Sequence, residues 1–458
     1  MSTNRLPGPS GVLATLRVLR GLAADPCPAL DACSEKYGAT FAVGVGPLRI
    51  VVIGDPAHLD AMFSTPSDAF KWGHWANVLG FIVGRTSMIV SDGADHRRRR
   101  GRVQPGFARR RLDGWIPMIL AETDRAIDET IAVSDSVIDL YPVGKNLVLH
   151  IVVKAFFGAG FSDRVDEIGA IFEQLQDYIE QPGARQIPHP LPFTRRARAR
   201  AAHRQFNRVV DVELARRRAA TETHLTDLLD ALLESGDAGD SGDSGDSGDS
   251  GLSDEEIRDQ VGTLIGAGYH TTAASLAWAL QRALATPAVW ARLRAEADAV
   301  LDNDAIGPET LQRLTAASAV VHEALRLHPA GVLSPRQAVR DVTIGAFTIP
   351  NRAMILWSPY LAGRDPSIWV NPLEFDPDRH IHPAPATVSA MESAWVPFGR
   401  GPRRCIGFAL AQMELTLIIS RLAQRLDLTL ETAATPTPYG TVVNRPRGGV
   451  RVTANARA

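Results

Sequence analysis

The alternation of hydrophobic and polar positions along this chain predicts many helices and a few short strands. Residues Thr40 to Val45 and Leu48 to Ile53 have the pattern of two strands joined by a Gly-Pro turn. Apolar residues recur with helical spacing throughout 115–180, including Leu147 to Phe157. Further helices are predicted at 56–63, 194–220, 310–329 and 406–422, and strand pairs at 342–349 and 439–450.

The longest predicted helix begins at Ser253 and is nearly continuously apolar as far as Leu280. Ser253 can cap this helix, and Glu256 three residues later completes a capping box. A helix of this length and composition is typical of one that passes through the middle of a large core.

A low-complexity run of Gly, Asp and Ser precedes this helix, from Ser235 to Gly251. It holds no large apolar residue that could offset the entropy of ordering, so it predicts a flexible linker inside one domain, at 235–251. Aspartates at every third position from 240 to 249 leave a calcium-binding array as the alternative, although the longer repeat that such arrays need is missing.

The composition permits a large core and excludes several functional classes. Of 458 residues, 45% are hydrophobic, and the formal net charge of −2 gives the whole chain no attraction to nucleic acid or anionic membranes. The three cysteines are odd in number and not spaced as a disulfide framework, which favours a reducing cytosol. The N-terminal apolar run is short and interrupted by Arg17 and Arg20, so it predicts neither a signal peptide nor a membrane span.

The stretch from Trp395 to Ala409 carries the clearest chemistry. It reads WVPFGRGPRRCIGFA and holds Cys405 between a turn rich in Gly and Pro and an apolar helical run. Glycines allow a tight turn and a close approach to a flat partner. At the start of a helix, free N–H groups and the dipole favour an anionic sulfur. The stretch therefore indicates a thiolate presented to a metal, and a lone structural cysteine is the alternative.

Here the chain resembles the cytochrome P-450 family of haem-thiolate monooxygenases. The family's cysteine loop reads F-x-x-G-x-R-x-C-x-G, matched by Phe398, Gly401, Arg403, Cys405 and Gly407. The resemblance implies that Cys405 is the proximal ligand of haem b iron and that Phe398, Arg403 and Gly407 contact the haem. It also implies a single domain over 1–458, mainly α with a smaller β-rich part. The haem would lie between the central long helix and the cysteine-loop helix.

The central helix supplies a second match, A-G-Y-H-T-T, where the family pattern is A/G-G-x-D/E-T-T. By resemblance, Ala267 and Gly268 lie against the haem, and Thr271 hydrogen-bonds the bound dioxygen and helps deliver protons. From the residues alone, Thr271 could instead bond a carbonyl one turn earlier. His270 stands where the family has an acid. It can shuttle protons near neutral pH or be an ordinary packed side chain, and both interpretations stay open.

A third match is E-x-x-R, formed by Glu323 and Arg326. Their spacing puts both side chains on one helix face, and apolar neighbours predict a buried pair rather than a surface pair of little value. The family's third member comes from a later F-x-P-x-R segment, matched here around Arg379. By resemblance, this network holds the cysteine loop and the haem in place, with one carboxylate between two guanidiniums.

The arginine-rich run from Asp92 to Phe107 has the composition of a solvated helix face, and no motif in it supports nucleic-acid binding. His96 and Arg100 are four residues apart and share one helix face. The resemblance implies that these two residues, together with Arg336 and Arg403, bind the haem propionates. The remaining arginines, Arg97 to Arg99 and Arg102, would dock an acidic electron-transfer partner.

The loop from Ser67 to Gly84 concentrates aromatic and aliphatic side chains, which suits an apolar ligand, although it could instead only cap the core. By resemblance this loop covers the substrate pocket, and the loop at 181–192 belongs to a mobile lid. The expected pocket residues are Trp75, Phe81, Ile82, Leu264, Val332, Leu333 and Val442. Gly363 stands where many relatives have His, so one haem-side or packing contact is expected to be missing.

The resemblance implies hydroxylation or epoxidation of a small apolar organic substrate with dioxygen. Electrons would come ultimately from NAD(P)H through a separate ferredoxin or flavodoxin and its reductase, because no flavin or iron–sulfur domain is fused. The expected protein is a cytoplasmic monomer that neither binds nucleic acid nor spans a membrane. Two alternatives stay open: a peroxide-driven peroxygenase or haem-thiolate isomerase, and a non-catalytic haem or ligand binder.

Overall fold

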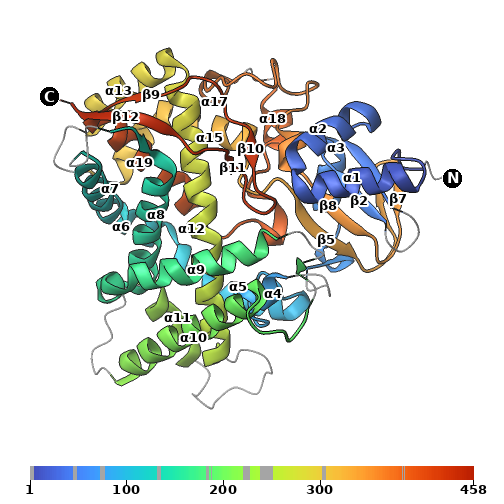
Figure 1. The fold of residues 1–458 in the computed structure, drawn as a ribbon, viewed down its shortest axis with the longest axis horizontal. Helices are drawn as coiled ribbons and strands as arrows, with labels where there is room; N and C mark the ends of the chain where they lie inside the picture. Colours follow the sequence, from blue (N-terminus) through green and yellow to red (C-terminus); the bar gives the residue numbers. More distant parts are fainter. Residues whose placement is uncertain are drawn as a thin grey trace. The chain divides into compact units, whose positions relative to one another are not determined.

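The computed structural model describes residues 5–44, 49–72, 78–131, 136–181, 185–186, 188–219, 227–237, 251–301, 306–383, 385 and 387–457. The chain forms two compact units, whose elements are labelled in Figure 1. Unit 1 comprises Met1–Lys71, Ile116–Leu147 and His270–Ala458, and unit 2 comprises Trp72–Trp115 and Val148–Tyr269.

Unit 1 holds the strands and the C-terminal helices. Its helices are α1 (Val12–Ala24), α2 (Pro26–Tyr37), α3 (Pro56–Ser64), α7 (Ile116–Ile131), α13 (Pro287–Leu301), α14 (Pro308–Arg313), α15 (Thr315–Leu327), α16 (Pro359–Ala362), α17 (Asp378–Ile381), α18 (Val388–Ala394) and α19 (Phe408–Arg425). Its strands are β1 (Thr40–Val43), β2 (Ile50–Ile53), β3 (Phe70–Lys71), β4 (Ile138–Asp139), β5 (Ser334–Ala338), β6 (Val342–Ile344), β7 (Phe347–Ile349), β8 (Met354–Trp357), β9 (Leu426–Leu430), β10 (Pro438–Tyr439), β11 (Arg445–Pro446) and β12 (Arg451–Ala456).

Unit 2 is helical in the residues that the structure describes. Its helices are α4 (Leu79–Ile82), α5 (Gly93–Val103), α6 (Arg109–Gly114), α9 (Val165–Ile179), α10 (Arg195–Ala219) and α11 (Leu228–Asp237), with short 3-10 turns at Gln104–Phe107 and Ala159–Arg164. Two helices continue along the chain from one unit into the other: α8 (Leu140–Phe157) and α12 (Asp254–Leu284).

The largest sheet of unit 1 has the strand order β1-β2-β8-β5-β3. The β2–β8 pair is parallel and the other three pairs are antiparallel. Because successive side chains of a strand point to opposite faces, the apolar run in β2 is buried on both sides. Val51 and Ile53 join one hydrophobic cluster, whereas Val52 joins another with Phe41. The strand pair predicted near the N-terminus is thereby confirmed.

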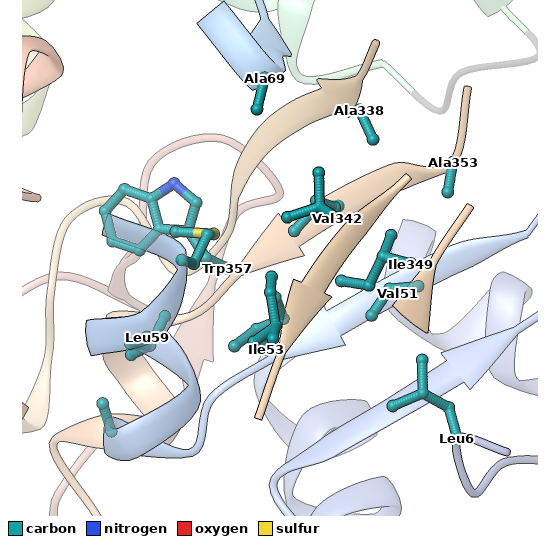
Figure 2. Close-up of a cluster of buried hydrophobic side chains, with 14 of the residues drawn as sticks. Leu6, Val51, Ile53, Leu59, Ala69, Ala338, Val342, Ile349, Ala353 and Trp357 are labelled. Carbon is teal, nitrogen blue, oxygen red and sulfur yellow. The ribbon is translucent and has the colours of Figure 1, made fainter. Parts of the chain in front are cut away.

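The first of these clusters covers one face of the sheet. Figure 2 shows Leu59 of α3 beside Ile53 and Trp357 of the sheet, and Val342 of β6 belongs to the same cluster. These side chains are nearly or fully buried, Trp357 at 5% exposed. α3 and the β6–β7 pair are therefore held against this face of the sheet by apolar packing.

Two of the smaller sheets correspond to the strand pairs predicted at 342–349 and 439–450. β6 and β7 form an antiparallel hairpin that turns at Gly345, whose φ is +57°. β10 pairs with β11 near the C-terminus, and β4, β12 and β9 form a three-stranded sheet.

The N-terminus of α12 forms the predicted capping box. The Glu256 N–H donates to the Ser253 hydroxyl at 3.3 Å, and the Ser253 N–H donates to the Glu256 carboxylate at 3.1 Å. These two bonds satisfy backbone donors that the first turn of a helix leaves without partners.

Three predicted boundaries were wrong. The helix expected at 310–329 is two helices, α14 and α15, because the backbone of Leu314 leaves the helical region with φ −81° and ψ 59°. The helix after the cysteine begins at Phe408 rather than Ile406. Residues 235–237, predicted to belong to the linker, lie in α11, and residues 238–250 lie outside the described residues.

Among the described residues, one helix is long and apolar enough to cross a membrane, namely α8. However, 61% of its span is buried inside the protein. The core helices of proteins that do not span membranes pass the same test, so this helix is weak evidence for a span.

Gly363 is closely packed, so no packing contact is missing there. A Cβ added there would lie 2.3 Å from the Arg326 carbonyl oxygen and 3.1 Å from that of Pro359. The Gly363 carbonyl in turn accepts a hydrogen bond from Arg326 Nη1. Only a residue without a side chain lets α15 and this segment approach so closely.

The substitution Gly363→Ala tests this packing. It should lower the free energy of unfolding by about 1–3 kcal/mol, because the added methyl must displace backbone atoms. The thermal unfolding midpoint of the purified protein measures the change. Gly114→Ala is the matched control, since a Cβ there meets nothing within 4 Å. Equal midpoints for Gly363→Ala and the unmodified protein would show that the backbone yields.

Candidate metal centre

The cysteine loop of unit 1 presents Cys405 on a tight turn before α19. Gly399 and Gly401 both have φ +66°, in the left-handed region that favours glycine. The Cys405 N–H donates to the Phe398 carbonyl at 2.9 Å and closes the turn. Because α19 starts at Phe408 with Gly407 as its N-cap, Cys405 precedes the helix instead of beginning it. The turn, rather than the first helical residues, therefore positions the sulfur.

Cys405 is also the exposed one of the three cysteines. Cys27 and Cys33 are buried in α2. Burial raises the pKa of Cys27 to about 12 and also raises the pKa of Cys33. Since the thiolate is the form that binds a metal, the two buried thiols are unsuitable ligands and Cys405 is the candidate.

Aromatic rings border the cysteine loop. The ring of Phe398 lies 5.9 Å from that of Trp395 and 6.4 Å from that of Phe408. The guanidinium of Arg404 stacks 3.6 Å over the Phe408 ring, while Arg403 is half-buried. The loop thus offers an apolar border and nearby positive charge.

Glu323 is the centre of a buried ion network in unit 1. The side chains of Glu323 and Arg326 are both 0% exposed and are joined by hydrogen bonds of 2.7 and 2.8 Å. Arg379 Nε donates to the same carboxylate at 3.0 Å. Burial by itself would raise the pKa of Glu323, but the bonds from Arg326 and His380 lower it to about 2. The carboxylate therefore stays ionised at every ordinary pH.

The same network ties α15 to the segment that leads toward the cysteine loop. Arg326 donates to the backbone carbonyls of Gly363, Pro372 and Glu374. The Asp376 N–H donates to Glu323 at 3.0 Å. The structure therefore brings together the side chains of Glu323, Arg326 and Arg379. The sequence analysis had grouped these residues only because they match the family's motifs.

The sequence analysis missed two histidines, one in this network and one beside it. His380 Nε2 lies 2.9 Å from Glu323 Oε2, and the carboxylate can only accept, so Nε2 carries the proton. His322 Nδ1 donates to the Ser318 carbonyl at 2.7 Å, which leaves Nε2 to accept from Gln412 of α19 at 2.9 Å. Their positions next to Glu323 and Arg379 in the sequence were the available signal.

His322 also supports the start of the cysteine loop. Trp395 Nε1 donates to the His322 carbonyl at 3.0 Å, and the two rings stack at 4.8 Å. Burial lowers the pKa of His322, which keeps the ring neutral. One side chain of α15 thus joins the residues before and after Cys405.

Small residues interrupt the burial of α12. The helix is buried at nearly every position from Val261 to Ala283, but Ala267 is exposed and Gly268 and Thr271 are half-exposed. These three positions share one helix face because they are three and four residues apart. His270, the residue before Thr271, is only 4% exposed. The exposed face suits the close approach of a flat ligand.

The candidate carboxylate-binding residues come from both units. In unit 2, His96 is 6% exposed and Arg100 is half-buried one turn later on α5. In unit 1, Arg336 is 7% exposed and donates to the Pro335 carbonyl at 2.8 Å.

Two of the arginines expected to dock a partner are used inside unit 2. Arg98 and Arg99 both pair with Glu256 at the start of α12. Burial would raise the pKa of Glu256, but hydrogen bonds from the two guanidiniums lower it to about 2. The docking prediction was therefore wrong for Arg98 and Arg99, and of the four arginines Arg97 and Arg102 remain candidates.

The next polar residues of α12 anchor the segment after α4. Asp259 accepts from the Thr86 N–H at 2.8 Å and its hydroxyl at 2.7 Å. Gln260 accepts from the Met88 N–H at 2.8 Å. Gly84 has φ +91°, and a Cβ there would lie 1.9 Å from the Asp259 carboxylate. These bonds to α12 therefore hold the segment that directly follows the predicted substrate loop in one position.

The expected pocket residues fall into two groups. In unit 2, the centre of the Phe81 ring lies 4.0 Å from the guanidinium carbon of Arg196. Ile82 and Leu264 are buried. The Ile82 carbonyl accepts a hydrogen bond from His203 Nδ1 at 2.6 Å. Trp75 lies outside the described residues.

In unit 1 the pocket residues differ in their packing. Val332 is 2% exposed and packs in the cluster of Leu30 and Phe41, with Leu333 half-buried against it. Val442 is 39% exposed.

Comparisons with known proteins agree on one family. A family model described as cytochrome P450 matches residues 9–451. Putative cytochrome P450 139 of Mycobacterium tuberculosis is 31% identical over 417 residues, which cover 89% of this chain and 90% of that protein. Putative cytochrome P450 137 of the same organism is 31% identical over 404 residues, covering 86% and 78%.

A solved structure shows the same fold. Retinoic acid-bound cyanobacterial CYP120A1 matches with a TM-score of 0.86 and 22% identity, covering 100% of both chains. At that identity the likeness concerns the fold alone. It confirms the predicted mainly α fold with a smaller β-rich part.

Glu414, on the helix that follows the cysteine loop, is a buried carboxyl group whose protonation can be tested. It is 1% exposed, its Oε1 has no hydrogen-bond partner among the described residues, and burial raises its pKa from 4.5 to about 8. The folded protein therefore keeps a proton that the unfolded chain releases, and stability falls as the pH rises from 4.5 to about 8.

Glu414→Gln should remove this pH dependence. The variant should unfold at a higher temperature than the unmodified protein near pH 8, and the difference should shrink toward pH 4.5. Thermal unfolding of the haem-loaded protein across this range is the measurement. Glu392→Gln, at an exposed position, is the control and should leave the slope unchanged. The same slope for Glu414→Gln and the unmodified protein would contradict a buried, protonated Glu414.

Proposed function

Because the chain belongs to the cytochrome P450 family, we propose that it hydroxylates or epoxidises a small apolar organic substrate with dioxygen. The family supports a haem-thiolate monooxygenase in general and haem iron as the cofactor. The substrate class and the supply of electrons belong to the proposal.

The residues present fit haem b. Cys405 is a single exposed thiol on a glycine turn, which suits one axial bond to iron and the close approach of a planar ring. His96, Arg100, Arg336 and Arg403 have the chemistry that recognises carboxylates, and propionates are carboxylates. The small exposed face of α12, at Ala267, Gly268 and Thr271, leaves backbone accessible to a flat partner.

Haem ligated by a thiolate supplies the activation of dioxygen when it is bound. The protein has three tasks around it. Cys405 provides the thiolate, and the Glu323 network keeps the loop that carries it in place. Thr271 holds a proton at its hydroxyl, and His270 can exchange protons near neutral pH. Apolar side chains among the expected pocket residues exclude water and orient the substrate.

The observation that carries this proposal is the position of Cys405. Its turn is closed by the bond to Phe398, and Trp395, three residues before Phe398, donates to the carbonyl of His322, the neighbour of the fully buried Glu323. A cysteine kept only for packing would be buried, as Cys27 and Cys33 are.

The partners follow the same proposal. Electrons would come from NAD(P)H through a ferredoxin or flavodoxin and its reductase, with Arg97 and Arg102 as candidate contacts for an acidic partner. We place the enzyme in the cytoplasm as a monomer that acts as one domain over 1–458, with no nucleic-acid partner and no membrane span.

A second candidate function rests on His270. This residue replaces the acid of the family pattern and is 4% exposed, so the usual carboxylate is absent from that position in the sequence. A peroxygenase, which takes its oxygen from peroxide, needs no proton delivery for dioxygen cleavage. Turnover with peroxide alone, and none with NAD(P)H, ferredoxin and its reductase, would select this alternative.

Cys405→Ala should abolish the thiolate-type spectrum of the reduced protein with carbon monoxide and all oxidation of substrate, because no other exposed thiol is present in the chain. The absorption spectrum of the purified protein measures this. Cys33→Ala is the control and should keep the spectrum. A variant without Cys405 that still shows it would refute the ligand assignment.

Thr271→Ala should lower the fraction of NAD(P)H-derived electrons that reach product while leaving substrate affinity nearly unchanged. We expect a loss of about tenfold or more in coupling, the usual size for a lost proton-transfer group. Product formed per NAD(P)H consumed is the readout, and spin-state titration reports affinity. Thr286→Ala is the control, because Thr286 lies two residues after the end of α12 and its hydroxyl donates to the Arg282 carbonyl. Full coupling in Thr271→Ala would rule out its proton role.

A further inference from the structure

Arg196, near the start of α10 in unit 2, is a half-buried cation that has no acidic partner among the described residues. Its Nη1 donates to the Tyr178 hydroxyl at 2.6 Å, and this is its one hydrogen bond to the described part of the chain. Its Nε is buried and has no hydrogen-bond partner there. A cation that is partly withdrawn from water is normally paired with a carboxylate, so the positive charge of Arg196 is left uncompensated.

Other arginines of unit 2 have the acidic partner that Arg196 lacks. Arg195, the preceding residue, pairs with Asp177 at 2.6 Å. Arg217, whose side chain is 10% exposed, pairs with Glu213 at 2.7 Å. The lack of a partner is therefore a property of this one position and is not shared by the arginines of α10 as a group.

Two aromatic rings hold the guanidinium of Arg196 in place of a carboxylate. Its central carbon lies 4.0 Å from the centre of the Phe81 ring and 5.8 Å from the centre of the Tyr178 ring. The Tyr178 hydroxyl donates to the Gln186 carbonyl at 3.1 Å, so the group that accepts from Arg196 is itself fixed. A ring face attracts a cation but carries no net negative charge. The guanidinium is thus held in one position and can still bind an anion.

The apolar surroundings of Arg196 indicate what kind of molecule would carry that anion. Phe81 and Ile82 are expected pocket residues, and Ile82 is 6% exposed. Because the Phe81 ring lies against the guanidinium, a molecule bound to Arg196 would place its remaining atoms beside this apolar segment. A carboxylate is the anionic group whose two oxygens match the fork of a guanidinium.

We propose that Arg196 binds a carboxylate of the substrate, and that the substrate class is therefore an apolar carboxylic acid. The proposal rests on the proposed monooxygenase function and narrows its substrate from any small apolar molecule to one that carries an ionised acid group. Arg196 determines specificity and takes no part in the oxidation. Because Phe81 and Tyr178 already hold the guanidinium, little side-chain freedom is lost when the substrate binds.

Paired ligands test the proposal with the haem-loaded protein. The probes are dodecanoic acid, naphthoic acid and abietic acid, each compared with its primary amide, so that the apolar body varies between pairs and the charge varies within a pair. Equilibrium dialysis measures the affinities. We expect at least one acid to bind about tenfold or more tightly than its amide, the usual size for a hydrogen bond to a charged group.

Substitutions of Arg196 separate recognition of the acid from packing. Arg196→Gln should lower the affinity for the acid to that for its amide and leave the affinity for the amide nearly unchanged. Arg196→Lys keeps the charge without the fork and should retain part of the preference. Arg195→Gln is the matched control, because Arg195 is exposed and already paired with Asp177, and it should bind like the unmodified protein. The absorption spectrum with carbon monoxide shows whether each variant keeps its haem site.

Two results would overturn the proposal. One is that no acid binds more tightly than its amide, and the other is that Arg196→Gln weakens acid and amide equally, which would make Arg196 a packing residue for Phe81. Oxidation of a neutral substrate would still leave the proposed function standing in either case. Acids that bind through Arg196 but are oxidised neither with the reductase system nor with peroxide would instead refute the proposed function and leave the carboxylate site in place.

Discussion

The ionised carboxylate of Glu323 is the constraint on which unit 1 depends. A carboxylate taken fully out of water costs several kcal/mol unless charges and donors surround it. Here Arg326, Arg379, His380 and a backbone N–H all bond to it, and Arg326 extends the network to three backbone carbonyls. Removing any one of these donors would leave the buried charge less well compensated. The carboxylate therefore requires the segment from Gly363 to Arg379 to lie against α15.

The position of α15 has two consequences for the segments around the cysteine loop. Gly363 must be glycine because the network draws its backbone to within contact of Arg326. The neighbouring His322 then connects α15 to Trp395 and Gln412, one before and one after Cys405. Glu414 shows the opposite solution on α19: burial raises the pKa of its carboxyl to about 8, and its Oε1 has no hydrogen-bond partner among the described residues, so it keeps a proton at neutral pH. The same residue type is thus charged where it organises the chain and neutral where it only fills the core.

Much of the candidate site could be predicted because it is encoded locally. The cysteine turn needs glycines at Gly399 and Gly401, and the capping box at Ser253 needs only residues three apart. The roles of Arg98 and Arg99 could not be predicted. Their bonds to Glu256 join residues more than 150 positions apart, and a run of arginines has the same local pattern whether it is solvated or paired. The break between α14 and α15 at Leu314 was also missed, because no Gly or Pro marks it in the sequence.

The sequence by itself determined the family, the ligand cysteine proposed for the haem and most helices, because periodicity, caps and short motifs act over a few residues. Only the tertiary structure decided which polar groups meet. It selected His380 as a support of the Glu323 network and His322 as a link to Gln412, left Glu414 Oε1 without a hydrogen-bond partner among the described residues, and placed Phe193 in solvent. Burial and charge compensation depend on distant segments, so the free energy of each of these groups is set by neighbours that the linear order does not reveal.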